Sequence, residues 1–302
     1  MEINKYNPKG KMSTKHVFSV SDLEEGDIYE ILHLARKLKQ KQQVKEKLGV
    51  FEGKNVAIML QSSSSRVRIS FELAINRIGG KTLYLSPSDA DFYRGLTHLD
   101  AAHILRAYGV NGLVAKNLAP DAVAQLKTNA LPVIHLKDGR DSACQVLANL
   151  FTMWEAAGRL SGVKYAALGN LKSPAAEEIN AYIKCGAEVT LCAPEELLPA
   201  GETLRKISQF GDVALTSSVQ QAVKNADVVT TVWDDETEKL AGYAVTEELL
   251  KEIPRAKYLH VLPVHHGEEV SDAVLYGENS AVFTRAANLI YVEQAMVMLY
   301  FR

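Results

Sequence analysis

The hydrophobic pattern of the chain alternates between two kinds of segment. Short runs rich in β-branched residues indicate buried strands, and stretches with apolar residues at helical spacing indicate helices between them. In the first half, the predicted strands are Asn55–Leu60, Lys81–Leu85, Gly112–Ala115 and Val133–His135. In the second half, they are Tyr165–Leu168, Glu188–Cys192, Val213–Thr216, Val228–Val232 and Tyr258–Val261. The alternation predicts an α/β protein whose parallel sheets are covered by helices on both faces.

The predicted helices suggest two domains. In the first half they are Arg68–Ile78, Thr97–Ala107 and Pro120–Thr128. An earlier helix is expected to open at a capping box of Ser21 and Glu24. A long apolar helix, Gln145–Ala157, runs into the glycine-bearing segment Gly158–Gly162, which is typical of a crossover between domains. We therefore expect domains at residues 1–150 and 151–285, with the apolar last helix, Ala286–Tyr300, packing back on existing structure.

Composition narrows the classes of function. The 302 residues are 47% hydrophobic, which is enough apolar material for two cores and argues against disorder. A formal net charge of -2 with no basic stripe argues against nucleic acid as a partner. Three irregularly spaced cysteines favour a reducing cytoplasm over a disulfide framework. The polar start of the chain lacks the apolar core of a signal peptide, and no apolar run is long enough to span a membrane.

A serine-rich turn is the strongest indication of chemistry. Ser62 to Ser65 follow a predicted buried strand and come directly before a helix, with Arg66 and Arg68 in its first turn. Backbone N–H groups, hydroxyls and guanidinium groups at a helix N-terminus suit a phosphate. Taken alone, these residues are equally consistent with an N-capping turn flanked by solvated arginines.

Several segments match the motifs of one known family. Ser64-Ser65-Arg66-Val67-Arg68-Ile69-Ser70-Phe71-Glu72 is similar to the signature Ser-Thr-Arg-Thr-Arg-x-Ser-Phe-Glu. His260-Val261-Leu262-Pro263 and Gly267-Glu268-Glu269-Val270 are similar to the segments His-Cys-Leu-Pro and Gly-Glu-Glu-Val. Over nearly its whole length the chain thus resembles the aspartate/ornithine carbamoyltransferases, and the ornithine branch more than the aspartate branch.

The resemblance implies a fold and a reaction. The fold is two doubly wound parallel-sheet domains: residues 1–150 bind carbamoyl phosphate, with helix 286–302 packed on them, and residues 151–285 bind the second substrate. The reaction is transfer of a carbamoyl group to an amine, with no metal or other cofactor. The implied assembly is a homotrimer, or a multiple of it, with sites near subunit boundaries.

The implied first-domain site combines retained and altered residues. Carbamoyl transfer requires a site that holds the phosphate, polarises the carbonyl and presents an unprotonated amine. By resemblance, Ser64, Ser65 and Arg66 bind the phosphate, with Arg66 able to make paired hydrogen bonds to it. Val67 replaces a threonine and removes one hydroxyl contact. Asp91 replaces a glutamine that a neighbouring subunit contributes, and it either binds a cation or a basic ligand or faces water.

The carbonyl-polarising positions also depart from the family pattern. The usual arginine aligns with Ala115, so the adjacent Lys116 is the candidate replacement, with a single-point charge in place of a guanidinium. Ser142 occupies the place of an imidazole donor and offers one hydrogen bond but no charge. Gln145 is retained.

In the second domain, the substrate-binding positions implied by the resemblance are Trp233, Asp234, Val261, Leu262 and Pro263. Val261 replaces a cysteine that orients the amine, and Leu289 replaces an arginine. The loop after Trp233 is shortened where the family grips the amino-acid substrate, so we expect weak or absent carbamoylation of ornithine.

Two hypotheses follow from these residues. One is a carbamoyltransferase acting on an amine other than ornithine. The other is a catalytically impaired paralogue that serves as an anion-binding or partner-binding subunit. His260, His265 and His266 lack the cysteine or carboxylate pattern of a zinc site, so no metal is expected. Cys144 has no recognisable catalytic partner motif and is expected to be a small core residue.

Overall fold

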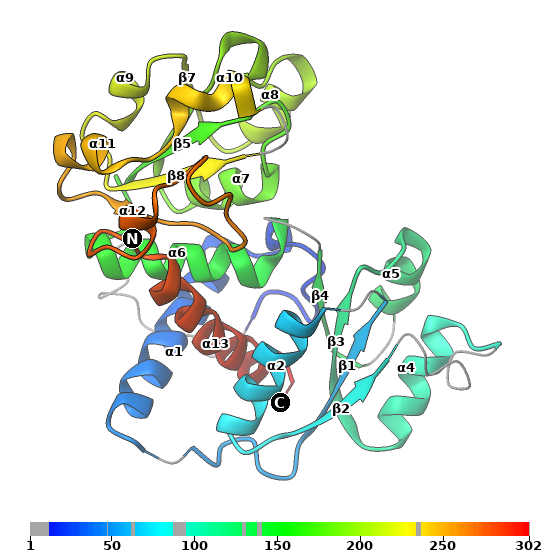
Figure 1. The fold of residues 1–302 in the computed structure, drawn as a ribbon. Helices are drawn as coiled ribbons and strands as arrows, with labels where there is room; N and C mark the ends of the chain where they lie inside the picture. Colours follow the sequence, from blue (N-terminus) through cyan, green and yellow to red (C-terminus); the bar gives the residue numbers. More distant parts are fainter. Residues whose placement is uncertain are drawn as a thin grey trace. The chain divides into compact units, whose positions relative to one another are not determined.

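The chain forms two compact units. The computed structural model describes residues 12–46, 48–61, 64–86, 95–128, 131–137, 141–233 and 237–301. Among these, residues 12–147 and 288–301 form what we call the N-terminal unit, and residues 148–287 form the C-terminal unit. The chain passes between the units within two helices, α6 (Ala143–Ala157) and α13 (Val282–Tyr300) (Figure 1). The predicted boundary at residue 150 falls inside α6. Helix α13 begins before the predicted Ala286, because the Arg285 N–H already bonds to the Ala281 carbonyl (2.8 Å).

A parallel sheet in the order β2-β1-β3-β4 forms the centre of the N-terminal unit. Its strands are β1 (Asn55–Leu60), β2 (Lys81–Leu85), β3 (Val110–Lys116) and β4 (Val133–Leu136). Val17 extends the sheet beside β4: its N–H donates to the Val133 carbonyl (2.8 Å), and its carbonyl accepts from the His135 N–H (2.7 Å). Strand β4 is buried throughout and β1 nearly so, as expected for strands covered on both faces.

Helices cover both faces of this sheet. Helices α4 (His98–Ala107) and α5 (Pro120–Lys127) lie on one face, and α1 (Glu25–Gln43), α2 (Ser65–Arg77) and the last part of α13 lie on the other (Figure 1).

The start of α1 differs from the sequence prediction. The expected capping box of Ser21 and Glu24 is wrong: Ser19 and Asp22 cap the short 3-10 turn η2 (Val20–Asp22). Because the Asp22 carboxylate accepts from the Ser19 N–H (2.9 Å), this turn opens two residues earlier than expected. Glu24 and Asp27 then form the box that begins α1.

The C-terminal unit contains a parallel sheet in the order β7-β6-β5-β8-β9. Its strands are β5 (Lys164–Gly169), β6 (Glu188–Cys192), β7 (Val213–Thr216), β8 (Val228–Val232) and β9 (Lys257–Tyr258). Its helices are α7 (Ala176–Lys184), α8 (Gly201–Ile207), α9 (Val219–Val223), α10 (Thr237–Leu240), α11 (Glu247–Glu252) and α12 (Asp272–Leu275), with 3-10 turns η4 (Glu195–Leu197) and η5 (Ala241–Tyr243).

Strand β9 is shorter than the predicted segment Tyr258–Val261. The Leu259 N–H still bonds to the Val229 carbonyl (2.9 Å) on β8. The next residue, His260, instead turns its ring toward Glu269. Strand β9 therefore begins one residue earlier and ends three residues earlier than predicted.

Each sheet reverses its winding direction at one place. In the N-terminal unit the chain moves outward from β1 to β2 and then returns to the other side of β1 at β3, so the switch lies between β1 and β3. In the C-terminal unit the switch lies between β5 and β8. The predicted doubly wound parallel sheets are thus confirmed. Ligands of such sheets bind beyond the carboxyl ends of the strands at the switch. Binding sites are therefore expected beyond the ends of β1 and β3 and of β5 and β8.

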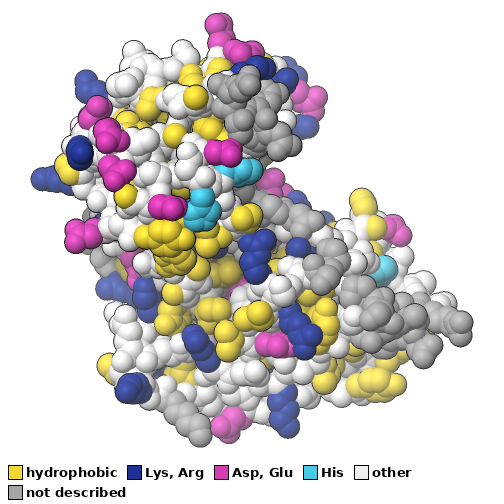
Figure 2. Space-filling view, in the orientation of Figure 1, with side chains coloured by type: hydrophobic (Ala, Val, Ile, Leu, Met, Phe, Trp, Pro, Cys, Tyr) yellow, Lys and Arg dark blue, Asp and Glu magenta, His cyan; other side chains and the backbone are white. Residues whose placement is uncertain are grey.

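The visible surface carries no tract of a single charge. Basic and acidic side chains are interspersed over the face in Figure 2. Cys144, Cys185 and Cys192 are buried thiols. Across the part of the chain that the structure describes, no helix is both long and apolar enough to cross a membrane.

Candidate active site

Ser64 and Ser65 of the serine turn follow β1 at the switch between β1 and β3, and Ser62 and Ser63 lie outside the described residues. Ser64 is the N-cap of α2, and its carbonyl accepts the first helical hydrogen bond, from the Arg68 N–H (3.1 Å). Among the described residues its hydroxyl makes no capping bond, and the first turn of α2 has no acidic side chain. Ser65 and Arg66 are exposed. The helix start therefore offers N–H groups, hydroxyls and a guanidinium to an anion, with no carboxylate in that turn to oppose it.

Arg68, one of the three arginines of α2, has side-chain partners on α2 and β2. The Arg68 guanidinium lies 4.2 Å from the centre of the Tyr84 ring, and its Nε donates to Glu72 Oε1 (2.9 Å). Arg68 is thus held along the helix and against β2.

Lys116 ends β3 on the other side of the switch. Its neighbour Ala115 belongs to the core cluster that includes residues of α4 and α5. Successive residues of a strand point to opposite faces, so the Lys116 side chain lies on the face that α2 covers. The Gln61 N–H donates to the Lys116 carbonyl (3.3 Å), which keeps β1 and β3 paired up to the turn. The geometry favours Lys116 over Ala115 as the polar group.

Ser142 and Gln145 lie at the start of α6, after the next strand, β4. Ser142 is buried, Gln145 is half-buried, and the Val146 N–H donates to the Ser142 carbonyl (3.0 Å). Val67 is half-buried in the first turn of α2 and presents no hydroxyl. Asp91 and Asp234 lie outside the described residues.

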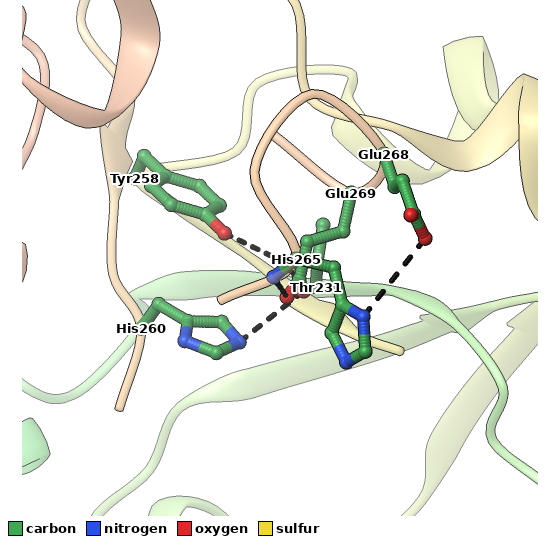
Figure 3. A network of polar contacts seen from close by, with 6 residues as sticks. All are labelled: Thr231, Tyr258, His260, His265, Glu268 and Glu269. Atoms are coloured by element: carbon green, nitrogen blue, oxygen red, sulfur yellow. Dashed lines mark hydrogen bonds and ion pairs between the residues drawn. The ribbon is translucent and has the colours of Figure 1, made fainter. Parts of the chain in front are cut away.

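A buried polar network surrounds Glu269 in the C-terminal unit (Figure 3). Thr231 Oγ1 donates to Glu269 Oε2 (2.5 Å) and lies 2.7 Å from the Tyr258 hydroxyl. His260 Nε2 lies 3.3 Å from Glu269 Oε2, and the His265 N–H donates to Glu269 Oε1 (2.7 Å). Three donors therefore converge on a carboxylate that is only 1% exposed.

Counting hydrogens fixes the direction of each bond in this network. Thr231 has one hydroxyl hydrogen, which goes to Glu269, so the Tyr258 hydroxyl donates to Thr231. Burial raises the pKa of the Glu269 carboxyl. The hydrogen bond and charge of His260, with the bonds from Thr231 and the His265 backbone, outweigh burial and hold that pKa below its ordinary value. Glu269 is therefore an anion at neutral pH.

His260 lies against both Glu269 and Tyr258. Its ring stacks on Tyr258, with centroids 6.0 Å apart. Its Nδ1 is buried and has no hydrogen-bond partner among the described residues. When Nε2–H donates to Glu269, Nδ1 carries the lone pair.

Trp233 and the proline loop follow the neighbouring strands β8 and β9. Trp233 is half-buried, and within the described residues its indole N–H is buried without a hydrogen-bond partner. Val261 and Leu262 are half-buried and Pro263 is exposed, with a cis peptide between Leu262 and Pro263. Val261 adds only apolar surface to this loop.

The remaining histidines of the loop pair with surface carboxylates. His265 Nδ1 lies 3.9 Å from Glu268, and His266 Nδ1 lies 2.7 Å from Asp272. Over the described stretches of the chain, no three His, Cys, Asp or Glu side chains are grouped so as to hold a metal ion.

The predicted residues are divided between the units, and the sequence analysis missed the centre of the second group. Ser64 to Val67, Lys116, Ser142 and Gln145 belong to the N-terminal unit, whereas Trp233 and Val261 to Pro263 belong to the C-terminal unit. Glu269 was recognised only as part of a motif. Its partner Thr231 lies 38 positions earlier, and only the pairing of β8 with β9 brings the two regions together.

Comparison with known proteins agrees with this arrangement. Residues 15–155 match the model of the aspartate/ornithine carbamoyltransferase carbamoyl-P binding domain, and residues 161–300 match that of the Asp/Orn binding domain. The chain belongs to the aspartate/ornithine carbamoyltransferase family.

Similar carbamoyltransferases cover nearly the whole chain. The ornithine carbamoyltransferase of Methanosarcina mazei is 31% identical over 95% of this chain and 99% of its own length. That of Bacillus subtilis is 33% identical over 94% of this chain and 92% of its own. The structure of ornithine carbamoyltransferase from Pyrococcus furiosus has a TM-score of 0.83 and 32% identity, covering 96% of this chain and 98% of that one. In this chain, the first matched segment contains Ser64 and Ser65 and the second contains the Glu269 network.

Proposed function

We propose that this chain transfers a carbamoyl group from carbamoyl phosphate to the amine of a small molecule. The observation that carries the proposal is the start of α2, where the Ser64 hydroxyl makes no capping bond among the described residues and the first turn has no acidic side chain. Ser64, Ser65 and Arg66 bind the phosphate group. Lys116, Ser142 and Gln145 act on the carbamoyl group at the same edge of the sheet.

The reaction requires one bond to form and one to break. The amine nitrogen attacks the carbonyl carbon, the bond from that carbon to the phosphate oxygen breaks, and phosphate leaves with the electron pair. The amine nitrogen must lose a proton.

The amine substrate is proposed to bind beside Trp233 and the loop of Val261, Leu262 and Pro263. Relatives are named for ornithine, but Val261 makes this loop more apolar than the family pattern. We therefore propose an amine or amino acid that differs from ornithine in the groups this loop contacts.

Calorimetric titration with carbamoyl phosphate tests the first step of this function. Wild type should bind, and Arg66→Ala should lose roughly 2 kcal/mol or more of binding free energy, because it removes a charge-assisted pair of hydrogen bonds. Arg68→Ala is the matched control, since Arg68 is held by Glu72 and Tyr84. A screen of amines for phosphate release then identifies the acceptor. Absence of binding by wild type would contradict the proposal.

The second candidate function is a non-catalytic, anion-binding or partner-binding subunit. Ala115 in the core and Val261 in the loop favour it, because both lack the polar groups that the family pattern places there. Carbamoyl-phosphate binding without product from any amine would support this candidate. Carbamoylation abolished by Arg66→Ala would exclude it.

We further propose a homotrimer located in the cytoplasm. Ile69 and Leu73, one turn apart on α2, are exposed apolar side chains that support a contact with a second copy. Three buried thiols are compatible with a reducing compartment.

A further inference from the structure

Helix α2, which begins with the serine turn, is bonded to α13 through buried side chains. Ser70 Oγ lies 2.9 Å from Glu293 Oε1, and these residues are 7% and 2% exposed. The same hydroxyl lies 3.1 Å from the Val67 carbonyl, in the first turn of α2. Figure 1 shows α2 running beside α13 in the N-terminal unit. Glu293, 223 positions after Ser70, is thus linked through the Ser70 hydroxyl to the first turn of α2.

The Ser70 hydroxyl stands between two acceptors but has one hydrogen. An ionised Glu293 draws that hydrogen toward itself, and a neutral hydrogen-bonding group at position 293 can instead donate to Ser70 and release the hydrogen to Val67. In both arrangements the side chain at position 293 is hydrogen-bonded to Ser70. The Ser70 hydroxyl in turn bonds to, or lies next to, the first turn of α2, which contains Ser65 and Arg66. Removing the side chain at 293 leaves a buried hydroxyl without its longer-range partner.

A second bond between the same helices serves as an internal comparison. Gln294 Nε2 donates to the Ala74 carbonyl (3.3 Å), and Gln294 is fully buried. Ala74 lies one turn further from the start of α2 than Ser70. The Glu293 and Gln294 contacts therefore join the same two helices, but the partner of Glu293, Ser70, also contacts the first turn through the Val67 carbonyl.

We propose that Glu293 is a positioning residue for the anion-binding turn. It acts through Ser70 to fix the orientation of the first turn of α2, and with it the direction of the N–H groups, the hydroxyls and the Arg66 guanidinium. An anion site needs its donors held within roughly 0.5 Å of the productive geometry, so a loosened first turn weakens binding even when every donor is present. This inference rests on the proposed function, in which that turn binds phosphate.

The test is calorimetric titration of the full chain with carbamoyl phosphate and, separately, with inorganic phosphate. Glu293→Ala and Ser70→Ala should each bind about tenfold more weakly than wild type, which corresponds to roughly 1.4 kcal/mol. Glu293→Gln should bind within about twofold of wild type, because the amide can donate to Ser70 while Ser70 donates to Val67. Gln294→Ala, which removes the other helix contact, should also bind within about twofold of wild type.

Thermal unfolding of each variant separates affinity from stability. Both alanine variants on α13 should lose stability, but only Glu293→Ala should lose anion affinity. Equal weakening by Gln294→Ala would show a general packing effect and overturn the positioning role, as would wild-type affinity in Glu293→Ala. If Glu293→Ala does not fold, Ser70→Ala decides, because it removes only a hydroxyl. Wild type that binds neither anion would overturn the proposed function and this inference with it; binding lost in Arg66→Ala but kept in Ser70→Ala would overturn this inference alone.

Discussion

At the scale of single residues, the position of one carboxylate determines the roles of its neighbours. Glu269 accepts from Thr231, from the His265 backbone and from His260, and this leaves Tyr258 as a donor and His260 Nδ1 as the open lone pair. A buried network of this kind is destabilised when a donor loses its acceptor. The stability of the fold should therefore fall when one carboxylate oxygen of Glu269 is replaced by an amide nitrogen.

Replacing Glu269 with glutamine should lower the free energy of unfolding by about 1–3 kcal/mol. The amide keeps one acceptor, whereas three donors require acceptors at this position. Urea unfolding at pH 7.5 measures the loss. Glu268→Gln is the matched control, since Glu268 is adjacent in sequence but exposed, and it should change the free energy by less than about 0.5 kcal/mol. Equal effects of the two substitutions would contradict the account of the network.

Acid sensitivity should arise in part from His16. Burial, with a smaller effect of Lys15 opposed by Asp22, lowers the pKa of His16 from 6.5 to about 4, and its Nδ1 is buried with no hydrogen-bond partner among the described residues. The unfolded chain therefore takes up this proton first. The His16 contribution to stability is complete above pH 6.5 and is lost progressively as pH falls toward 4.

His16→Gln should flatten the decline in stability between pH 6.5 and pH 4.5, as measured by urea unfolding at several pH values. His103→Gln, at an exposed position of α4, should leave the decline unchanged. A decline as steep in His16→Gln as in wild type would show that other groups control acid unfolding.

At the scale of elements, strand bounds could be predicted where Gly, Pro, Ser, Asn or Asp residues flank the strand. Strands β1, β2, β6, β7 and β8 have the predicted bounds. Strand β9 was predicted too long, since its apolar sequence continues past the residues that pair with β8. The serine turn was visible in the sequence because its residues are consecutive. The Glu269 network and the Ser70–Glu293 bond were not, because each joins elements that only the tertiary fold brings together.

The packing of α13 and the residue after it against the sheet of the N-terminal unit requires a glycine at position 112. A Cβ added at Gly112 on β3 would lie 2.2 Å from the ring of the buried Phe301, which follows α13. Gly112→Ala should therefore lower the free energy of unfolding by roughly 1–3 kcal/mol, through overpacking. Thermal unfolding measures this loss. Gly26→Ala in α1, where an added Cβ meets no atom within 4 Å, should leave stability unchanged or raise it. A neutral Gly112→Ala would mean that Phe301 can move at little energetic cost.

At the scale of the whole molecule, the proposed trimer requires an apolar contact surface on each copy. Ile69 is 56% exposed on α2, one turn from the exposed Leu73. Ile69→Asp should shift the protein from trimer to monomer in light scattering after size exclusion, because it buries a carboxylate in an apolar contact. Tyr108→Asp is the control, since Tyr108 is 78% exposed after α4 and lies outside α2. A trimer that survives Ile69→Asp would place the contact elsewhere.

The division of the N-terminal unit between two distant stretches of the chain also orders events during synthesis. Residues 12–147 leave the ribosome long before residues 288–301, which complete the same unit. Until then, Ser70 and Ala74 of α2 lack their hydrogen-bond partners on α13, whereas residues 148–287 are continuous and can close their own core. The unit that is translated first is thus the last to be finished, and we expect it to depend more on chaperones during synthesis than the other unit does.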